Sequence, residues 1–229
     1  MRVAVVTPYG AEKIISAMKG LEIEEVKKNP EFVIAYGGDG TILKAERLYP
    51  TIPKIPFKKS SICNKCTMYR LSELERVLEA VKKGDYHVRE FAKVEGRAKG
   101  KRLVGLNEMQ VHNADPRKAL RFDIKAGGRT IEGVIGDGIV AATPYGSTGY
   151  YKAIGYEPFD VNIRLGFNNA TPRLGYIELR RGEKAEVVVR REKGILLADN
   201  SKETANLKPG DEVVVSESKE KARFVEVKS

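Results

Sequence analysis

Several residue types are scarce in this chain of 229 residues, which contains no tryptophan, two histidines and two cysteines. The histidines, His87 and His112, lack the spacing of metal ligands, so no metal site formed by the protein itself is expected. Cys63 and Cys66 form one Cys-x-x-C without a partner pair, which argues against structural zinc. Three interpretations of the two cysteines stay open: a redox pair, a disulfide and two packed thiols. The disulfide and the packed thiols, which have structural roles, are favoured over redox catalysis.

Long apolar runs are also missing, so no bilayer-spanning segment and no membrane partner are expected. The segment Met1–Pro8 predicts a short strand and not a signal peptide, and a cytoplasmic location is therefore expected. With 41% hydrophobic residues the chain is predicted to be folded. Gln110 is its only glutamine while 31% of the residues are charged, a combination typical of heat-loving organisms.

The formal net charge of +10 fits either a nucleic-acid-binding protein or one that binds polyphosphorylated small molecules. The lysines and arginines are spread along the chain, and no helix-turn-helix, RNP or zinc-finger pattern occurs. The sequence therefore predicts a small anionic partner and no nucleic acid. Most of the excess positive charge is expected on the solvated surface.

Strands and helices alternate in the first third of the chain, and the pattern changes near Gly84 and Asp85. The periodicity predicts strands at Val3–Val6 and Phe32–Tyr36, and helices at 11–28, Ile42–Leu48 and Leu71–Lys83, the last with Ser72 as N-cap. A proline-rich stretch lies between the last two helices. Short β-type segments then recur between turn signals, at 86–94, 101–112, 120–126, 133–142, 176–179, 185–190, 212–216 and 223–227. The predicted domains are an α/β domain, 1–84, and a β-rich domain, 85–229.

A glycine-rich loop, Gly37-Gly38-Asp39-Gly40-Thr41, joins the buried strand to the next helix. Such glycines remove the Cβ barrier and permit positive φ values, so consecutive backbone N–H groups can converge on an anion. A strand–loop–helix junction also brings a phosphate to the positive end of a helix dipole. Asp39 among the glycines predicts a carboxylate that handles a hydroxyl proton or a divalent cation. The alternative is a turn with a geometric role alone.

Two further polar segments follow. Asn107-Glu108 lies inside a predicted strand, where adjacent polar residues are usually solvated strand surface. The segment 137–150 runs from Asp137-Gly138 through a strand into Thr143-Pro144-Tyr145-Gly146-Ser147-Thr148-Gly149-Tyr150. It either ends the strand, with Ser147 capping the next helix, or offers hydroxyl groups and an aromatic face to a ligand.

In this order the three segments resemble the NAD kinase family, which pairs a GGDGT loop with an Asn-Glu dipeptide and a DG…TPTGSTAY segment. The chain is similar to an abbreviated, archaeal-type member. The resemblance implies phosphorylation of the adenosine-ribose 2′-hydroxyl of NAD to give NADP, with ATP or polyphosphate as donor and Mg²⁺ as cofactor. It also implies a homo-oligomer, and an α/β N-terminal domain with a parallel sheet followed by a β-rich, β-sandwich-like domain.

The same resemblance implies roles for individual residues. Asp39 is the expected catalytic residue, which acts on the ribose hydroxyl. A turn at Asp199–Ser201 corresponds to a substrate-contacting turn of the family. The expected substrate- and nucleotide-binding residues are Gly37, Gly38, Gly40, Thr41, Asn107, Glu108, Lys118, Asp137, Tyr145, Gly146, Ser147, Thr148 and Tyr150.

The sequence departs from the family pattern in several places, of which two bear directly on the substrate site. The family loop Gly-Ile-Asn-x-Gly-x-x-Gly-Phe corresponds to 60–69, where the glycines are replaced. Tyr145 and Gly149 stand where the family has threonine and alanine. Two alternatives therefore stay open, a related kinase with a different acceptor and a non-catalytic dinucleotide-binding protein. The GGDGT loop does not decide the substrate, because diacylglycerol and sphingosine kinases share it.

Overall fold

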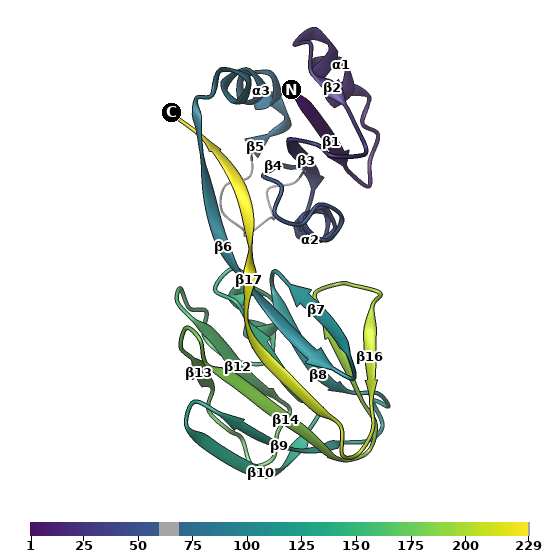
Figure 1. Ribbon diagram of the computed structural model, residues 1–229, viewed down its shortest axis with the longest axis vertical. Helices are drawn as coiled ribbons and strands as arrows, with labels where there is room; N and C mark the ends of the chain where they lie inside the picture. Colours follow the sequence, from purple (N-terminus) through teal and green to yellow (C-terminus); the bar gives the residue numbers. More distant parts are fainter. Residues whose placement is uncertain (60–68, 229) are drawn as a thin grey trace. The chain divides into compact units, whose positions relative to one another are not determined.

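The computed structural model describes residues 1–59 and 69–228 and divides the chain into two compact units. Unit 1 comprises residues 1–91 and the segment from 220 onward, and unit 2 comprises residues 92–219. Two long strands, β6 (Tyr86–Ala98) and β17 (Glu212–Val227), belong to both units (Figure 1). The division differs from the expected one in two respects, because the break falls within β6 and the C-terminal residues belong with the N-terminal unit. Cys63, Cys66 and most of the substituted family loop lie outside the described residues.

The described chain has three α-helices, α1 (Glu12–Gly20), α2 (Asp39–Leu48) and α3 (Leu74–Lys83). In this part of the chain no helix is long and apolar enough to cross a bilayer. The remaining strands of unit 1 are β1 (Arg2–Val6), β2 (Glu24–Glu25), β3 (Phe32–Gly37), β4 (Lys54–Lys58) and β5 (Tyr69–Arg70). Those of unit 2 are β7 (Lys101–Gly105), β8 (Glu108–Asn113), β9 (Leu120–Ala126), β10 (Arg129–Gly136), β11 (Gly138–Ala142), β12 (Ile163–Asn168), β13 (Ile177–Leu179), β14 (Lys184–Arg191), β15 (Gly194–Ala198) and β16 (Thr204–Leu207).

Unit 1 is built on a parallel sheet in the order β2-β1-β3-β4, as expected, and β5 and the end of β17 also pair in parallel with β4. Ile34, Ile55 and Phe57 are buried in one core with α1 and α3. Val33 and Ala35, which point to the opposite face of β3, are also buried, so the sheet is covered on both faces. The strand order reverses between β1 and β3, and ligands of open α/β sheets bind at the carboxyl ends of the strands at such a point.

A buried ion pair holds α2 on this sheet. Lys54 of β4 is fully buried, and its ammonium contacts the Glu46 carboxylate and, at 2.8 Å, the carbonyl oxygen of Tyr49, the C-cap residue of α2. A positive charge there complements the negative end of the helix dipole. Removal of either partner would leave a buried charge uncompensated, so the pair fixes the C-terminal end of α2.

Unit 2 consists of two antiparallel sheets that pack face to face (Figure 1). One contains β10, β9, β14 and the first part of β17, and the other has the order β13-β12-β11-β8-β15-β16. A continuous core contains residues of both sheets, with Phe122 and Val187 from the first and Val111, Leu165 and Leu196 from the second. The expected β-sandwich-like architecture is confirmed.

Two predicted helices have different ends in the structure. The helix expected over 11–28 stops at Gly20, because Glu22 has a φ of 56° and the chain then pairs with β1 as β2. The helix after the glycine loop begins at Asp39 and not at Ile42, so Asp39 is part of its first turn.

The third predicted helix is capped differently from the expectation. Residues 71–73 form a 3₁₀ turn before α3, and Ser72 is not an N-cap. The Glu73 carboxylate instead accepts the backbone N–H of Arg70 at 2.9 Å. This bond satisfies the backbone donor of the N-cap residue, which is the part that a glutamate at the third position plays in a capping box.

Several strand predictions were incomplete. The segment 101–112 is divided into β7 and β8, and 133–142 is divided into β10 and β11 at Asp137. The segments 212–216 and 223–227 are one strand, β17. Strands β2, β4, β5, β12, β15 and β16 were not predicted. β4 contains Pro56 within the proline-rich stretch, a residue type that sequence rules keep out of strand interiors.

The hydroxyl group of Tyr151 is buried and has no hydrogen-bond partner among the described residues. Its ring is stacked on Tyr156 at a centroid distance of 5.0 Å and lies edge-on to Phe159 at 5.2 Å. Burial raises the pKa of this phenol above its usual value. Tyr151→Phe removes an unsatisfied polar group and keeps the packing, so it is expected to raise the free energy of unfolding by about 1 kcal/mol.

Chemical denaturation measures this change, and Tyr156→Phe is the matched control. The Tyr156 hydroxyl donates to the Leu174 carbonyl at 2.9 Å and accepts the Phe167 N–H at 3.0 Å, so its loss is expected to destabilise the protein. Equal destabilisation by both variants would show that the Tyr151 hydroxyl has a partner.

Candidate functional site

The glycine loop lies at the junction of β3 and α2 in unit 1. Gly37 ends β3, Gly38 is the N-cap residue of α2, and the Thr41 N–H donates to the Gly38 carbonyl at 2.9 Å. A Cβ on Gly37 would lie 2.2 Å from Thr41 Oγ1, so the buried threonine requires glycine there. Gly37, Gly38 and Gly40 all lie outside the left-handed region, so the loop does not use the positive φ values that glycine permits. The glycines provide space and not a left-handed turn.

Gly38 leaves the backbone open on one side of this junction. Its φ of −105° and ψ of −169° are values that any residue adopts, and a Cβ built on it would meet no atom of residues 1–59 or 69–228 within 4 Å. The dipole of α2 places partial positive charge at this end of the helix. Gly38 and Asp39 therefore lie where a phosphate can approach the backbone at the carboxyl edge of the sheet.

In unit 2, Asn107 and Glu108, the Asn-Glu pair, lie where the chain passes from β7 to β8. Both residues are buried. The Asp199 carboxylate accepts three backbone N–H groups here, from Leu106 and Asn107 at 2.8 Å each and from Glu108 at 3.1 Å. Asp199 thereby interrupts the strand and positions the pair through its backbone. Sequence reasoning placed this aspartate in a substrate-contacting turn, and its contacts in the structure are with the chain itself.

The turn that follows β11 is anchored on the same segment. The Thr143 N–H donates to the Asn107 carbonyl at 2.9 Å, and its hydroxyl donates to the Leu106 carbonyl at 2.6 Å. The Gly146 N–H in turn donates to Thr143 Oγ1 at 3.0 Å. A Cβ on Gly146 would lie 2.0 Å from the Asn107 carbonyl oxygen, so glycine is required for this contact between backbones. Thr143 was not among the predicted site residues.

A π-helical turn, Ser147–Tyr151, comes next and is kinked at Gly149, which has a φ of −92° and a ψ of −125°. The Ser147 hydroxyl donates to the Pro144 carbonyl at 2.8 Å, so it stabilises the turn and does not cap a helix. A Cβ on Gly149 would lie 3.9 Å from the side chains of the Asn-Glu pair. Gly149, which stands in place of the family's alanine, therefore faces that pair. The neighbouring Thr148 is exposed.

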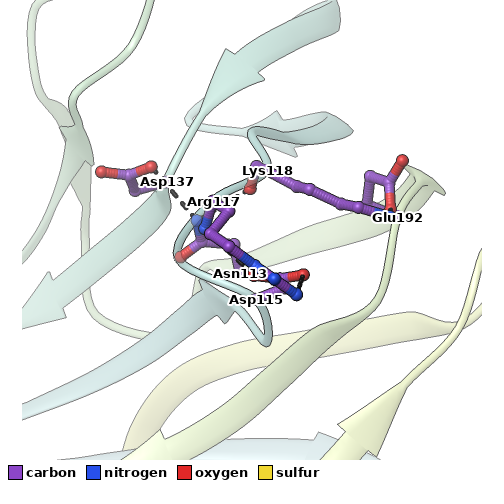
Figure 2. A network of polar contacts seen from close by, with 6 residues as sticks. All are labelled: Asn113, Asp115, Arg117, Lys118, Asp137 and Glu192. Atoms are coloured by element: carbon purple, nitrogen blue, oxygen red, sulfur yellow. Dashed lines mark hydrogen bonds and ion pairs between the residues drawn. The ribbon is translucent and has the colours of Figure 1, made fainter.

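Asp137 lies between β10 and β11, and its carboxylate accepts amide N–H groups of Asn113 at 3.2 Å and Asn169 at 3.3 Å. The Asn113 amide also donates to the backbone carbonyl of Lys118 at 2.9 Å, as Figure 2 shows. The Lys118 ammonium is 3.2 Å from the Glu192 carboxylate. Asn113 thus links two predicted site residues, and sequence reasoning did not identify it.

His112 and Asn168 are two further polar residues beside this network that the sequence analysis did not assign. His112 Nδ1 lies 3.1 Å from the Asn113 carbonyl oxygen, which only accepts, so Nδ1 carries the proton. Nε2 then accepts from the Asn168 amide at 3.3 Å, and the same amide donates to the Tyr150 hydroxyl at 3.3 Å. A signal was present in the sequence, because Glu108 and His112 are four residues apart on one strand and share a face.

The structure therefore groups the predicted residues of unit 2 into two neighbourhoods. The Asn-Glu pair lies with the turn that contains Tyr145, Gly146, Ser147 and Thr148. Asp137 lies with Asn113 and Lys118, and Tyr150 is joined to His112 through Asn168. The loop Gly37–Thr41 belongs to unit 1. Within the described residues no group of three or more His, Cys, Asp or Glu side chains could hold a metal ion.

No protein-family model matches the sequence, but curated proteins do. An NAD kinase from Pyrococcus furiosus is 29% identical over 231 residues, which cover 95% of this chain and 78% of that protein. A bifunctional NADP phosphatase/NAD kinase from Methanocaldococcus jannaschii is 33% identical over 138 residues, or 57% of this chain. The match covers 24% of that longer protein.

Solved structures show the same relationship. An NAD kinase from Archaeoglobus fulgidus in complex with ATP has a TM-score of 0.83 and 25% identity, and the match covers 100% of this chain and 94% of that one. Yeast NADH kinase complexed with NADH has a TM-score of 0.86, and at 16% identity it shows similarity of fold.

An α/β unit with a glycine loop at a helix N-terminus, joined to a β-sandwich that positions a buried Asn-Glu pair, defines a two-domain nucleotide-binding fold. The similar proteins and solved structures described above identify the family with this fold. This chain belongs to the NAD kinase family.

Proposed function

We propose that this protein transfers a phosphoryl group from ATP or inorganic polyphosphate to the adenosine-ribose 2′-hydroxyl of NAD and so forms NADP. The observation that carries the proposal is the open backbone of Gly38 next to Asp39, at the carboxyl edge of a parallel sheet. The relatives named above, from Pyrococcus furiosus and Archaeoglobus fulgidus, are NAD kinases and support the choice of reaction.

In the proposed reaction, unit 1 binds the donor phosphates and supplies Asp39, which accepts or orients the proton of the attacking hydroxyl. Mg²⁺ supplies charge neutralisation on the donor phosphates. The residues fit this limited role, because Mg²⁺ is usually held by one or two carboxylates together with substrate phosphates, and Asp39 supplies a carboxylate beside the glycine loop. Positioning and electrostatic stabilisation then account for most of the rate enhancement.

Unit 2 binds the dinucleotide in the same proposal. The Asn-Glu pair combines an amide and a carboxylate, which suit ribose hydroxyls as donor and acceptor. Asp137, Lys118, Tyr145, Thr148 and Tyr150 complete the proposed nucleotide site. ATP and NAD are intracellular metabolites, so the proposal includes a cytoplasmic location and, by family resemblance, a homo-oligomer.

The direct test is NADP formation from NAD with ATP and Mg²⁺, and separately with inorganic polyphosphate, at elevated temperature. A panel of other hydroxyl acceptors is assayed with labelled donor in parallel. NADP as the main product supports the proposal. Phosphorylation of a non-nucleotide acceptor alone, or tight NAD binding without product from either donor, would refute it.

Gly38→Ala is expected to lower activity by about tenfold or more with little loss of stability. The added methyl group meets no atom of the described residues, so the free energy of unfolding should change by no more than about 1 kcal/mol. The same methyl group would obstruct a phosphate that approaches the backbone. Steady-state kinetics and thermal unfolding measure the two effects. Gly20→Ala is the matched control, because its Cβ also meets nothing within 4 Å.

A further inference from the structure

A cluster of one cation and two aromatic rings lies in unit 1, outside the residues assigned above. Lys59 Nζ lies 3.7 Å from the centroid of the Tyr9 ring, and the Tyr9 and Tyr36 rings lie 5.7 Å apart. The Tyr9 N–H donates to the Thr7 hydroxyl at 3.0 Å, which orders the loop that follows β1. Lys59, Tyr9 and Tyr36 are called the Tyr9 cluster below.

The strand register places this cluster at the same sheet edge as the glycine loop. Gly37, the last residue of β3, pairs with Lys58, the last residue of β4. Lys59 and Gly38 are therefore the first residues beyond two parallel strands, which lie about 4.8 Å apart. The loop that carries Tyr9 leaves the same edge, because β1 is parallel to β3 and adjacent to it.

The aromatic ring gives Lys59 a defined position. An exposed lysine ordinarily samples many rotamers, so a contact with phosphate costs the conformational entropy of fixing one of them. Here the ring face attracts the ammonium, while Tyr36 supports the ring. Lys59 is itself exposed and Tyr9 is 44% exposed, so the ammonium on the ring face is accessible to a ligand. A compact, pre-positioned positive charge is the chemistry that recognises a polyphosphate.

We propose that Lys59, held on the Tyr9 ring, binds the polyphosphate chain of the phosphoryl donor beside Gly38 and Asp39. The inference rests on the proposed function and adds the residue that recognises the charge of the donor. A polyphosphate chain is common to ATP and inorganic polyphosphate, so the same residue serves both donors. The acceptor is recognised elsewhere, and its affinity does not depend on Lys59.

The test measures equilibrium binding of ATP with Mg²⁺, and of inorganic tripolyphosphate, in the absence of acceptor. Lys59→Gln is expected to weaken both by about tenfold or more, since a hydrogen bond between charged groups is lost. Lys44→Gln is the matched control, because it removes one positive charge from an exposed position of α2. Tyr9→Leu should weaken binding about three- to fivefold, whereas Tyr9→Phe keeps the ring face and should bind like wild type.

A double variant tests whether the two side chains act together. If Tyr9 acts through Lys59, then Tyr9→Leu added to Lys59→Gln weakens binding no further. Donor affinity of Lys59→Gln equal to that of Lys44→Gln would overturn the proposal, even if NADP is formed. Failure of the proposed function gives a different result from failure of the Lys59 proposal. In that case the wild-type protein would bind the donor in a Lys59-dependent way but form no NADP.

Discussion

Asp39→Asn is expected to lower the turnover number for NADP formation by about 10²- to 10⁴-fold, while the KM values for ATP and NAD change little. Asparagine has the size of aspartate but cannot accept the proton of the attacking hydroxyl. The position in the first turn of α2 makes the variant tolerable for folding, because the lost charge–dipole attraction is only about 0.3–1 kcal/mol. Single-turnover and steady-state assays of NADP formation measure the effect.

Glu12→Gln provides the matched control for this experiment. Glu12 is an exposed carboxylate in the first turn of α1, so its replacement removes the same charge from an equivalent helix position. It should cost a similar small amount of stability and leave turnover unchanged. If Asp39→Asn retained the turnover of this control, another group would have to activate the hydroxyl.

The junction that carries Asp39 was predictable because its signals are local. A buried strand followed by glycines and then an amphipathic segment specifies strand, loop and helix within residues 32–48. The conformation of the loop was not predictable in the same way. Gly37 is required by the Thr41 side chain, and Gly38 has an extended conformation open to every residue type, so glycine did not signal positive φ here.

The interruptions of the strands were not predictable, because the groups that cause them are distant in sequence. The segment 101–112 has continuous strand character, and it is broken by Asp199, more than 90 residues later in the chain. The role of Thr143 is similar, since its hydroxyl binds the Leu106 carbonyl from 37 residues away. Sequence identified the Asn-Glu pair as a motif and did not identify the residues that position it.

The domain boundary illustrates the same limit. Turn residues at Gly84 and Asp85 do mark the end of α3, where Gly84 has a φ of 82°. The units are separated farther on, inside β6, because the first residues of that strand and the end of β17 interact with unit 1. The Lys228 N–H donates to the Asp85 carbonyl at 3.1 Å, a contact between segments more than 140 residues apart.

Asp199→Asn is expected to lower the free energy of unfolding by about 2–3 kcal/mol and the rate of NADP formation by about 10²-fold. One carboxylate accepts three N–H groups in the native protein, and hydrogen bonds to a charged group contribute about 1.5–3 kcal/mol each. An amide group offers a single acceptor oxygen and turns an N–H donor toward other donors. Asparagine tolerates the native φ of 47°, so backbone strain does not contribute to the loss.

The activity decrease follows from the position of the three N–H groups. They belong to Leu106 and to the Asn-Glu pair itself, so their release moves the side chains proposed to bind the ribose. A displacement of about 1 Å in such groups can lower a rate 10²-fold. KM for NAD is expected to rise, whereas donor affinity, which depends on unit 1, should stay unchanged.

Asp211→Asn distinguishes this anchoring role from a general effect of removing a turn carboxylate. Asp211 accepts one backbone N–H, from Lys208 at 2.7 Å, and that hydrogen bond together with Lys99 lowers the pKa of its carboxyl. Its replacement should cost little stability, because the carboxylate is screened by solvent, and should leave the kinetics of NADP formation unaffected. If Asp199→Asn matched this control in both denaturation and KM for NAD, the Asn-Glu pair would be positioned without the carboxylate. The sandwich core, and not Asp199, would then hold the nucleotide-binding segment in place.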